Sequence, residues 1–421
     1  MLRSDGFMLH GSPRRAAAAV AAALLLLPLL WPLRAQEPGT EVRALWVVRT
    51  TLTSPAAIAT MVSAARGGGF NTLLVQVRGR GDAYFLNGLE PRPPAVGTQP
   101  GFDPLATTIA RAHDAGLRVH AWVNVNLVAS ANELPAARAH VVYRHPEWLM
   151  IPRGLAEELA AVDPRRPGYL GRLARYVRGH PNELEGLYLS PVSPRSAAYT
   201  TSVVRDIVER YDVDGLHLDY IRYPRDDFDY GRDTLTAFRA SVATDLTAVD
   251  RRTYDRRAAG KEPLVYTEAF PERWRAFRTQ RLTALLTSLG RTAKAIRPSA
   301  LVSVAVVPDP QEAVARRLQD WRGWLRGGLV DVVCPMAYTT DSALFAAQIG
   351  AAREIAGGHG LWAGIGAYRL SSPQIVEHVR TARRLGVGGV ILFSYDSLAD
   401  PARGPNYLSQ VGRAAFLTGT Y

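Results

Sequence analysis

The chain of 421 residues has a formal net charge of +12 at pH 7 and is 47% hydrophobic, so it can bury a sizeable core and is not expected to be disordered. Nearly all of the positive charge comes from scattered arginines, since Lys261 and Lys294 are the only lysines, and the lack of a long basic tract argues against nucleic acid as a partner. The single cysteine, Cys334, excludes an internal disulfide and lies in an apolar run typical of a buried small side chain. We therefore expect no redox chemistry.

The amino-terminal segment has the pattern of a processed export signal. The pair Arg14 and Arg15 precedes an apolar stretch, Ala16 to Leu33, which two prolines interrupt, and the small residue Ala35 follows. This pattern predicts a signal peptide over residues 1–35 and a periplasmic or secreted mature protein without stable membrane insertion. An uncleaved amino-terminal anchor is the alternative, although the leucine-rich core is short for a membrane span.

Beyond residue 40, short apolar runs typical of strands alternate with segments typical of helices, which is the pattern of a parallel α/β sheet. Eight such units predict a single domain over residues 36–421 with the α/β fold of a closed (β/α)8 barrel, the TIM barrel. The expected strands are Arg43 to Val48, Asn71 to Val77, Leu117 to Val125, Asp214 to Asp219, Leu301 to Val307, Val330 to Met336, Leu361 to Ile365 and Gly389 to Phe393. The expected helices include Pro55 to Arg66, Pro104 to Ala115, Thr201 to Tyr211, Arg273 to Ile296, Ser342 to Ile355 and Pro373 to Leu385.

The connections after the third and fourth strands are much longer than a plain helical crossover. In a barrel of this kind the loops that follow the strands build the working face. We therefore expect two long insertions that wall a cleft above the carboxyl ends of the strands.

Alternation along the strands separates the side chains that face the helices from those that point into the barrel. In the fourth strand Leu216 and Leu218 fit the helix-facing side, and the inward residues end with Asp219. The same alternation predicts inward or strand-end positions for Gly215 and His217, for His120, Trp122 and Asn124 on the third strand, for Gln76, Arg78 and the following Asp82 on the second, and for Asp309 after the fifth.

The inward carboxylate of Asp219 requires a physical reason, because an unpaired charge removed from water costs several kcal/mol. One interpretation is a structural ion pair with Arg222 or Arg78. The other is a nucleophile or charge stabiliser for an oxocarbenium-like transition state, for which glycosidases use paired carboxyl groups. The position at the carboxyl end of a barrel strand favours the second interpretation.

Other inward residues are candidates for contacts with a sugar. His120 and His217 are interpreted as sugar-binding or supporting groups, with satisfied interior histidines as the alternative. Neither has metal-ligand spacing on a helix, and no metal site is predicted. Aromatic residues in or just after strands, among them Trp122, Tyr220 and Tyr338, offer faces that can stack on sugar rings.

Six segments together resemble the glycosyl-hydrolase-like 10 family of bacterial exported proteins. The match spans nearly the whole mature chain, and residues 214–224 are its most specific part. The segments are Glu41 to Val47 (EVRALWV), Asn71 to Tyr84 (NTLLVQVRGRGDAY), His120 to Asn124 (HAWVN), Asp212 to Pro224 (DVDGLHLDYIRYP), Gln319 to Leu325 (QDWRGWL) and Asp331 to Tyr338 (DVVCPMAY). The resemblance implies a TIM barrel that hydrolyses cell-envelope glycans, with peptidoglycan strands stripped of their peptides as the favoured substrate class.

The resemblance also implies which positions form the site, although the chain departs from the family in two places. It has Pro335-Met336 where the family often shows Pro-Gln, and Ser190-Pro191 where the family often shows Asp-Pro. The implied site-forming residues are Arg78, Asp82, His120, Asn124, His217, Asp219, Tyr220, Arg222 and Tyr338.

The general acid is not evident, because no inward glutamate follows a strand. Asp82, Asp309 and Asp341 are the candidates, and strand phase favours Asp309. The leading hypothesis is an endo-acting glycoside hydrolase that needs no cofactor and uses Asp219 as nucleophile or stabiliser. The alternatives are a hydrolase of another amino-sugar polymer, such as poly-glucosamine, and a catalytically inactive glycan-binding barrel. The sequence leaves the oligomeric state open.

Overall fold

The computed structural model describes residues 41–130, 132–260 and 262–417. The predicted signal peptide and its cleavage site lie outside these residues. Within the described ranges, no helix is both long and apolar enough to cross a membrane, and no group of three or more histidine, cysteine or acidic side chains could hold a metal ion.

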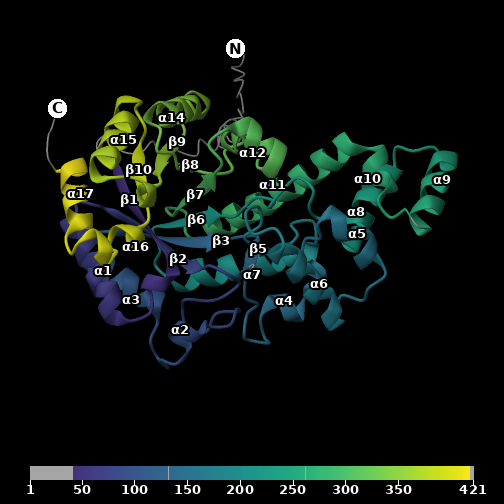
Figure 1. The fold of residues 1–421 in the computed structure, drawn as a ribbon, viewed down its shortest axis with the longest axis horizontal. Helices are drawn as coiled ribbons and strands as arrows, with labels where there is room; N and C mark the ends of the chain where they lie inside the picture. Colours follow the sequence, from purple (N-terminus) through teal and green to yellow (C-terminus); the bar gives the residue numbers. More distant parts are fainter. Residues whose placement is uncertain (1–40, 131, 261, 418–421) are drawn as a thin grey trace, which may run out of the picture. The chain divides into compact units, whose positions relative to one another are not determined.

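Eight parallel strands form a closed barrel in the order β1-β10-β9-β8-β7-β6-β3-β2 (Figure 1). Helices such as α3, α14 and α15 pack on the outside of the strands. The predicted (β/α)8 barrel is confirmed, and each expected strand range overlaps an observed strand. These strands are β1 (Val42–Val47), β2 (Thr72–Arg78), β3 (Arg118–Asn124), β6 (Gly215–Asp219), β7 (Leu301–Val306), β8 (Val332–Ala337), β9 (Gly360–Ile365) and β10 (Gly389–Phe393).

Several helices begin at a proline that follows a serine or aspartate cap. The side chains of Ser54, Asp103 and Ser193 each accept a hydrogen bond from a backbone N–H in the first turn, and the following proline needs no such partner. The helices are α1 (Pro55–Gly67), α2 (Pro94–Gly97), α3 (Pro104–Asp114), α4 (Val141–Arg144), α5 (Arg153–Ala160), α6 (Pro167–Arg178), α7 (Pro194–Arg210), α8 (Arg232–Ala243), α9 (Ala248–Ala259), α10 (Val265–Ala269), α11 (Pro271–Ile296), α12 (Pro310–Arg317), α13 (Trp321–Arg326), α14 (Ser342–Ala356), α15 (Ser372–Arg384), α16 (Tyr395–Leu398) and α17 (Tyr407–Phe416).

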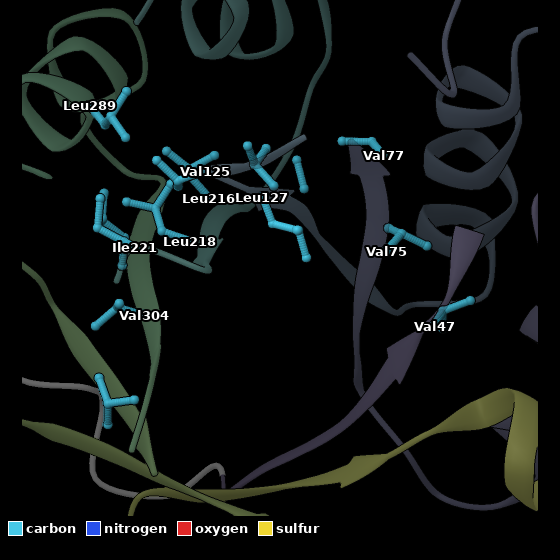
Figure 2. Close-up of a cluster of buried hydrophobic side chains, with 14 of the residues drawn as sticks. Val47, Val75, Val77, Val125, Leu127, Leu216, Leu218, Ile221, Leu289 and Val304 are labelled. Carbon is cyan, nitrogen blue, oxygen red and sulfur yellow. The ribbon is translucent and has the colours of Figure 1, made fainter. Parts of the chain in front are cut away.

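The strands bury side chains on both faces, as a barrel surrounded by helices requires. Leu216 and Leu218 belong to an outer cluster that also contains Leu289 of α11, and Figure 2 shows part of it. A separate cluster, which includes Trp46 and Trp122, fills the barrel interior. Each buried leucine stabilises the fold by about 2 kcal/mol, so a one-residue slip of β6 would be strongly disfavoured.

Between β3 and β6, the chain adds a two-stranded antiparallel sheet made of β4 (Leu127–Ser130) and β5 (Gly186–Tyr188). The two strands approach so closely at Gly186 that a Cβ atom there would overlap the carbonyl group of Ala129. Only glycine therefore fits at the first position of β5. Between β6 and β7 the chain adds α8, α9, α10 and α11.

A buried carboxylate links these two insertions. Asp229, after β6, accepts hydrogen bonds from Ser190 at 2.7 Å, from Thr234 at 3.0 Å and from Tyr223 at 3.4 Å. Ser190 belongs to the insertion after β3, so the network joins the two segments. Burial raises the pKa of Asp229 to about 6, although these hydroxyl donors oppose the rise.

The raised pKa of Asp229 makes the stability of the fold depend on pH. Its pKa is higher in the folded chain than its ordinary value of about 3.9, so the folded state binds the proton more tightly and stability is lost as the pH rises from about 4 to above 6. We expect Asp229→Asn to remove this loss, which amounts to about 3 kcal/mol. Urea unfolding at pH values across this range measures it, with the exposed Asp226→Asn as control. Parallel profiles for the wild type and Asp229→Asn would contradict the assignment.

Candidate active site

Asp219, the last residue of β6, is held by one oxygen of its carboxylate. It is 6% exposed, and Oδ1 accepts hydrogen bonds from the backbone N–H of Tyr220 at 2.7 Å and from Nη1 of Arg222 at 3.2 Å. Among the described residues, none donates to Oδ2. Burial raises the pKa of Asp219, and Arg222 and the Tyr220 N–H oppose the rise. One oxygen is therefore fixed and the other is left for a ligand.

Tyr220 turns the chain directly after this carboxylate. Its φ of +51° lies in the left-handed region, which costs a residue with a side chain about 1–2 kcal/mol. Such strain persists where the surroundings enforce it and is common at functional sites. The guanidinium carbon of Arg222 lies 4.2 Å from the Tyr220 ring centroid and that of Arg80 lies 5.9 Å from it. The ring is therefore fixed by two cations, with Tyr188 of β5 at 6.3 Å.

Aromatic side chains from three other strand ends surround the predicted site residue Tyr338. Its ring stacks on Phe393 at 5.4 Å and meets the edges of Trp46 and Tyr368, each at 6.2 Å. Burial, together with the charge of Asp219, raises the pKa of Tyr338 far above its usual value, so the hydroxyl keeps its proton. Tyr368 is 44% exposed and offers an accessible ring at the edge of this group.

The structure places His217 inside the barrel. The imidazole is fully buried, and its Nε2 accepts a hydrogen bond from the indole N–H of Trp46 at 3.0 Å. The ring proton therefore lies on Nδ1 and points to Ser303 Oγ at 2.9 Å. Burial lowers the pKa of His217 to about 3, which keeps the ring neutral. His217 supports Trp46 from inside the barrel.

His120 and Trp122 also lie in the barrel interior rather than at a sugar-binding surface. They are 1% and 3% exposed. The His120 ring packs on Trp362 at 5.6 Å, and Trp122 packs on His217 and Phe393, each at 6.4 Å. Burial lowers the pKa of His120 to about 4. Both side chains therefore belong to the packed interior of the barrel.

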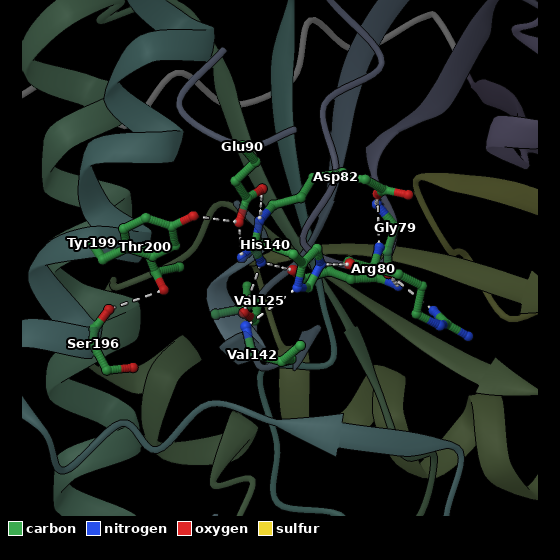
Figure 3. Close-up of polar contacts among 12 residues, drawn as sticks. Gly79, Arg80, Asp82, Glu90, Val125, His140, Val142, Ser196, Tyr199 and Thr200 are labelled. Atoms are coloured by element: carbon green, nitrogen blue, oxygen red, sulfur yellow. Dashed lines mark hydrogen bonds and ion pairs between the residues drawn. The ribbon is translucent and has the colours of Figure 1, made fainter. Parts of the chain in front are cut away.

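Arg78 and Asn124, two of the implied site-forming residues, bind other parts of the protein. Arg78 is completely buried and binds Glu90 through two hydrogen bonds of 2.7 and 2.6 Å. Its remaining nitrogen donates to the carbonyls of Asn124 and Val125. Asn124, equally buried, donates to Gly79 at 2.8 Å. Figure 3 shows Glu90 and Val125 among the residues of this polar cluster. Both side chains are therefore engaged by other parts of the protein.

The three candidates for the general acid, Asp82, Asp309 and Asp341, accept hydrogen bonds from backbone N–H groups. Oδ1 of Asp82 accepts the backbone N–H groups of Gly79 and Arg80 at 2.9 and 2.8 Å, which closes the turn after β2 (Figure 3). Asp309 is exposed and caps α12, accepting from the N–H groups of Gln311 and Glu312 at 2.7 and 2.9 Å. Asp341 caps α14 in the same way. These contacts do not support a proton-donating role for Asp309, which strand phase favoured.

The structure instead brings a carboxylate that the sequence analysis did not consider to the Tyr220 ring. Oε2 of Glu185, the residue before β5, accepts a hydrogen bond from the Tyr220 hydroxyl. Glu185 is exposed, and its charge acts on Asp219, Tyr220 and Arg222. Of the predicted residues, Asp219, Tyr220, Arg222 and Tyr338 lie together at this place.

A family comparison covers most of the described chain. The model of the family described as Glycosyl hydrolase-like 10 matches residues 41–170 and 172–379. The chain belongs to this family. In this member of the glycosyl hydrolase-like 10 family, the segment 214–224 that carries the most specific resemblance includes β6 and the Tyr220 turn.

Two curated relatives are similar in sequence to this family member. Glycosyl hydrolase DigH of Escherichia coli (strain K12) is 27% identical over 293 residues, which are 64% of this chain and 55% of DigH. Glycosyl hydrolase YngK of Bacillus subtilis (strain 168) is 25% identical over 164 residues, which are 37% of this chain and 26% of YngK. The chain thus spans about half the length of DigH, and less of YngK.

Both solved structures share the fold. The PgaB (BpsB) glycoside hydrolase domain from Bordetella bronchiseptica superposes with a TM-score of 0.61 at 15% identity, over 90% of this chain and 100% of that domain. The catalytic domain of β-amylase from Paenibacillus polymyxa gives a TM-score of 0.57 at 11% identity, over 90% of this chain and 98% of that one. At these identities the likeness shows the barrel fold alone.

Proposed function

We propose that this family member is a glycoside hydrolase whose reaction centre is Asp219. The observation that carries the proposal is the carboxylate at the carboxyl end of β6, which is held through Oδ1 and has no described partner at Oδ2. Cleavage of a glycosidic bond develops positive charge at the anomeric carbon and the ring oxygen. A fixed, poorly solvated negative charge stabilises that state more strongly than it would in water.

Arg222 fits this role because it favours the ionised form of the carboxylate without covering it. Burial alone would favour the protonated acid, and the guanidinium opposes that shift. The alternative interpretation is a purely structural ion pair, in which the partner would bind both carboxylate oxygens of Asp219. Here Arg222 reaches only Oδ1, at 3.2 Å, so the pairing with Arg222 and a catalytic role are compatible. Arg78, the other predicted partner, is bound to Glu90.

We propose peptide-free peptidoglycan strands as the substrate. Amino-sugar rings suit a site that combines aromatic side chains such as Tyr220, Tyr338 and Tyr368 with hydrogen-bond donors. Arg80 and Arg222 lie over the Tyr220 ring, and Arg317 interacts electrostatically with Glu185. These positive charges also suit sugars that carry a carboxylate. Membership of a family of glycosyl hydrolases supports hydrolysis over binding alone.

Product release from defined glycans tests the substrate. We expect the purified protein to release soluble fragments from peptidoglycan strands whose peptides have been removed, and far less from intact peptidoglycan, xylan or cellulose. Faster hydrolysis of poly-glucosamine would favour the other amino-sugar polymer. Binding to the glycan strands without any release of product would identify an inactive glycan-binding barrel and contradict the proposal.

We further propose that the protein acts outside the cytoplasm after cleavage near Ala35. The support is the pattern of residues 1–35, an arginine pair followed by an apolar segment and a small residue. Amino-terminal sequencing of the protein from its native host tests this, and an intact Met1 would contradict the cleavage.

A further inference from the structure

Glu185 is placed at the site by the close packing of the small sheet. It directly precedes β5, whose Gly186 pairs with Ser130 of β4. Because a side chain at Gly186 would collide with Ala129, this glycine allows the sheet to form next to Glu185. Tyr188, two residues after Gly186, is 4% exposed and packs on Tyr220. The carboxylate is thus positioned by buried neighbours although Glu185 itself is exposed.

Glu185 and Asp219 bind opposite ends of one residue. Asp219 accepts the backbone N–H of Tyr220, and Glu185 accepts its phenolic hydroxyl. Tyr220 is held in the left-handed conformation that permits this arrangement, and Arg222 lies over its ring while also binding Asp219. The length of a tyrosyl side chain therefore separates two carboxylates that share one set of contacts.

Glycosidases use two carboxyl groups placed on either side of the scissile bond. Inverting glycosidases keep the two groups roughly 6.5–9.5 Å apart so that a water molecule enters, whereas retaining enzymes keep them at about 5 Å. Several other acids near the strand ends are engaged elsewhere: Asp82 and Asp309 accept backbone N–H groups, and Asp229 lies in a buried network of hydroxyls.

We propose that Glu185 is the general acid of the reaction centred on Asp219, an inference that rests on the proposed function. The carboxyl proton of Glu185 passes to the glycosidic oxygen while the bond from that oxygen to the anomeric carbon breaks, and the electron pair leaves with the oxygen. A water molecule bonds to the anomeric carbon and gives a proton to the Asp219 carboxylate. Solvent then returns the proton from Asp219 to Glu185.

The dependence on the leaving group distinguishes an acid from a residue that only shapes the site. For Glu185→Gln we expect a loss of about 10²–10⁴-fold in kcat on peptide-free glycan strands. We expect a loss below about tenfold on a dinitrophenyl glycoside of a short N-acetylglucosamine oligosaccharide, since dinitrophenolate leaves without a proton.

Glu183→Gln is the matched control, because Glu183 lies two residues away, is exposed and pairs with Arg225 instead. It should behave as the wild type on both substrates. Equal losses of Glu185→Gln on the two substrates, or none on the glycan strands, would overturn the assignment while an active wild type upholds the proposed function. Retained configuration in the first product would also overturn this pairing. A wild type inactive on both substrates would overturn the proposed function itself.

Discussion

Asp219→Asn should leave the barrel folded and reduce the hydrolysis of peptide-free glycan strands by about 10³-fold or more. Asparagine keeps the shape of the side chain and an acceptor for the Tyr220 N–H, but it removes the negative charge. The pKa of Asp219 is raised by burial despite Arg222, so the ionised group is held at a net cost to the fold. Removing the charge is therefore expected to change the melting temperature little.

Activity and stability of the same variant separate the two interpretations of Asp219. If the carboxylate only anchored Arg222, its loss would leave a poorly exposed guanidinium unpaired and lower stability by about 3 kcal/mol. A folded Asp219→Asn protein with normal turnover would end the proposed mechanism. Steady-state hydrolysis and thermal unfolding of one preparation provide both measurements.

The same electrostatics set the acidic side of the pH profile. Asp219 acts as the ionised carboxylate, so hydrolysis is lost as the pH falls through its raised pKa. Arg222→Gln removes the charge that opposes this rise, and the acidic limb should move to higher pH. An unchanged limb would show that another group controls it.

The barrel could be predicted because its strands carry two signals at once. Apolar runs indicate strands buried on both faces, and polar residues at alternate positions, such as His217 and Asp219 between Leu216 and Leu218, reveal which face points inward. The position of Asp219 could be predicted for the same reason, since a charge at the end of a buried strand stands out from its neighbours.

The roles of individual polar side chains could not be predicted, because they depend on partners that no local pattern reveals. Glu90, which binds Arg78, lies in a loop, and Trp46, which binds His217, lies 171 residues away. Glu185 precedes a three-residue strand inside an insertion, where no periodicity marks it. Asp309 is different, because aspartate followed by proline and an early glutamate is a helix start signal. This signal predicted a helix cap, whereas the strand alternation predicted an inward side chain.

Among changes of stability, the largest expected concerns the pair of Arg78 and Glu90. Their side chains are 0% and 1% exposed, and Nη2 and Oε1 lie 2.6 Å apart. Burial opposes the charge of Arg78, but Glu90 outweighs this effect and raises the pKa of the guanidinium. A guanidinium keeps its proton even when it is buried in a protein, so Arg78 stays charged when its partner is removed. Tyr199 of α7 also donates to Glu90, at 3.2 Å.

Glu90→Gln should accordingly lower the free energy of unfolding by about 3–5 kcal/mol, because it leaves a buried cation with carbonyl acceptors but no counter-charge. Glu262→Gln, which breaks the exposed pair with Arg257, should cost less than about 1 kcal/mol. The double variant Arg78→Met with Glu90→Leu should recover part of the loss, since neither buried charge remains. Urea unfolding of all four proteins measures these differences. Equal urea midpoints for Glu90→Gln and Glu262→Gln would contradict this prediction. They would show that water reaches Arg78 and that the buried pair does not stabilise the carboxyl end of β3.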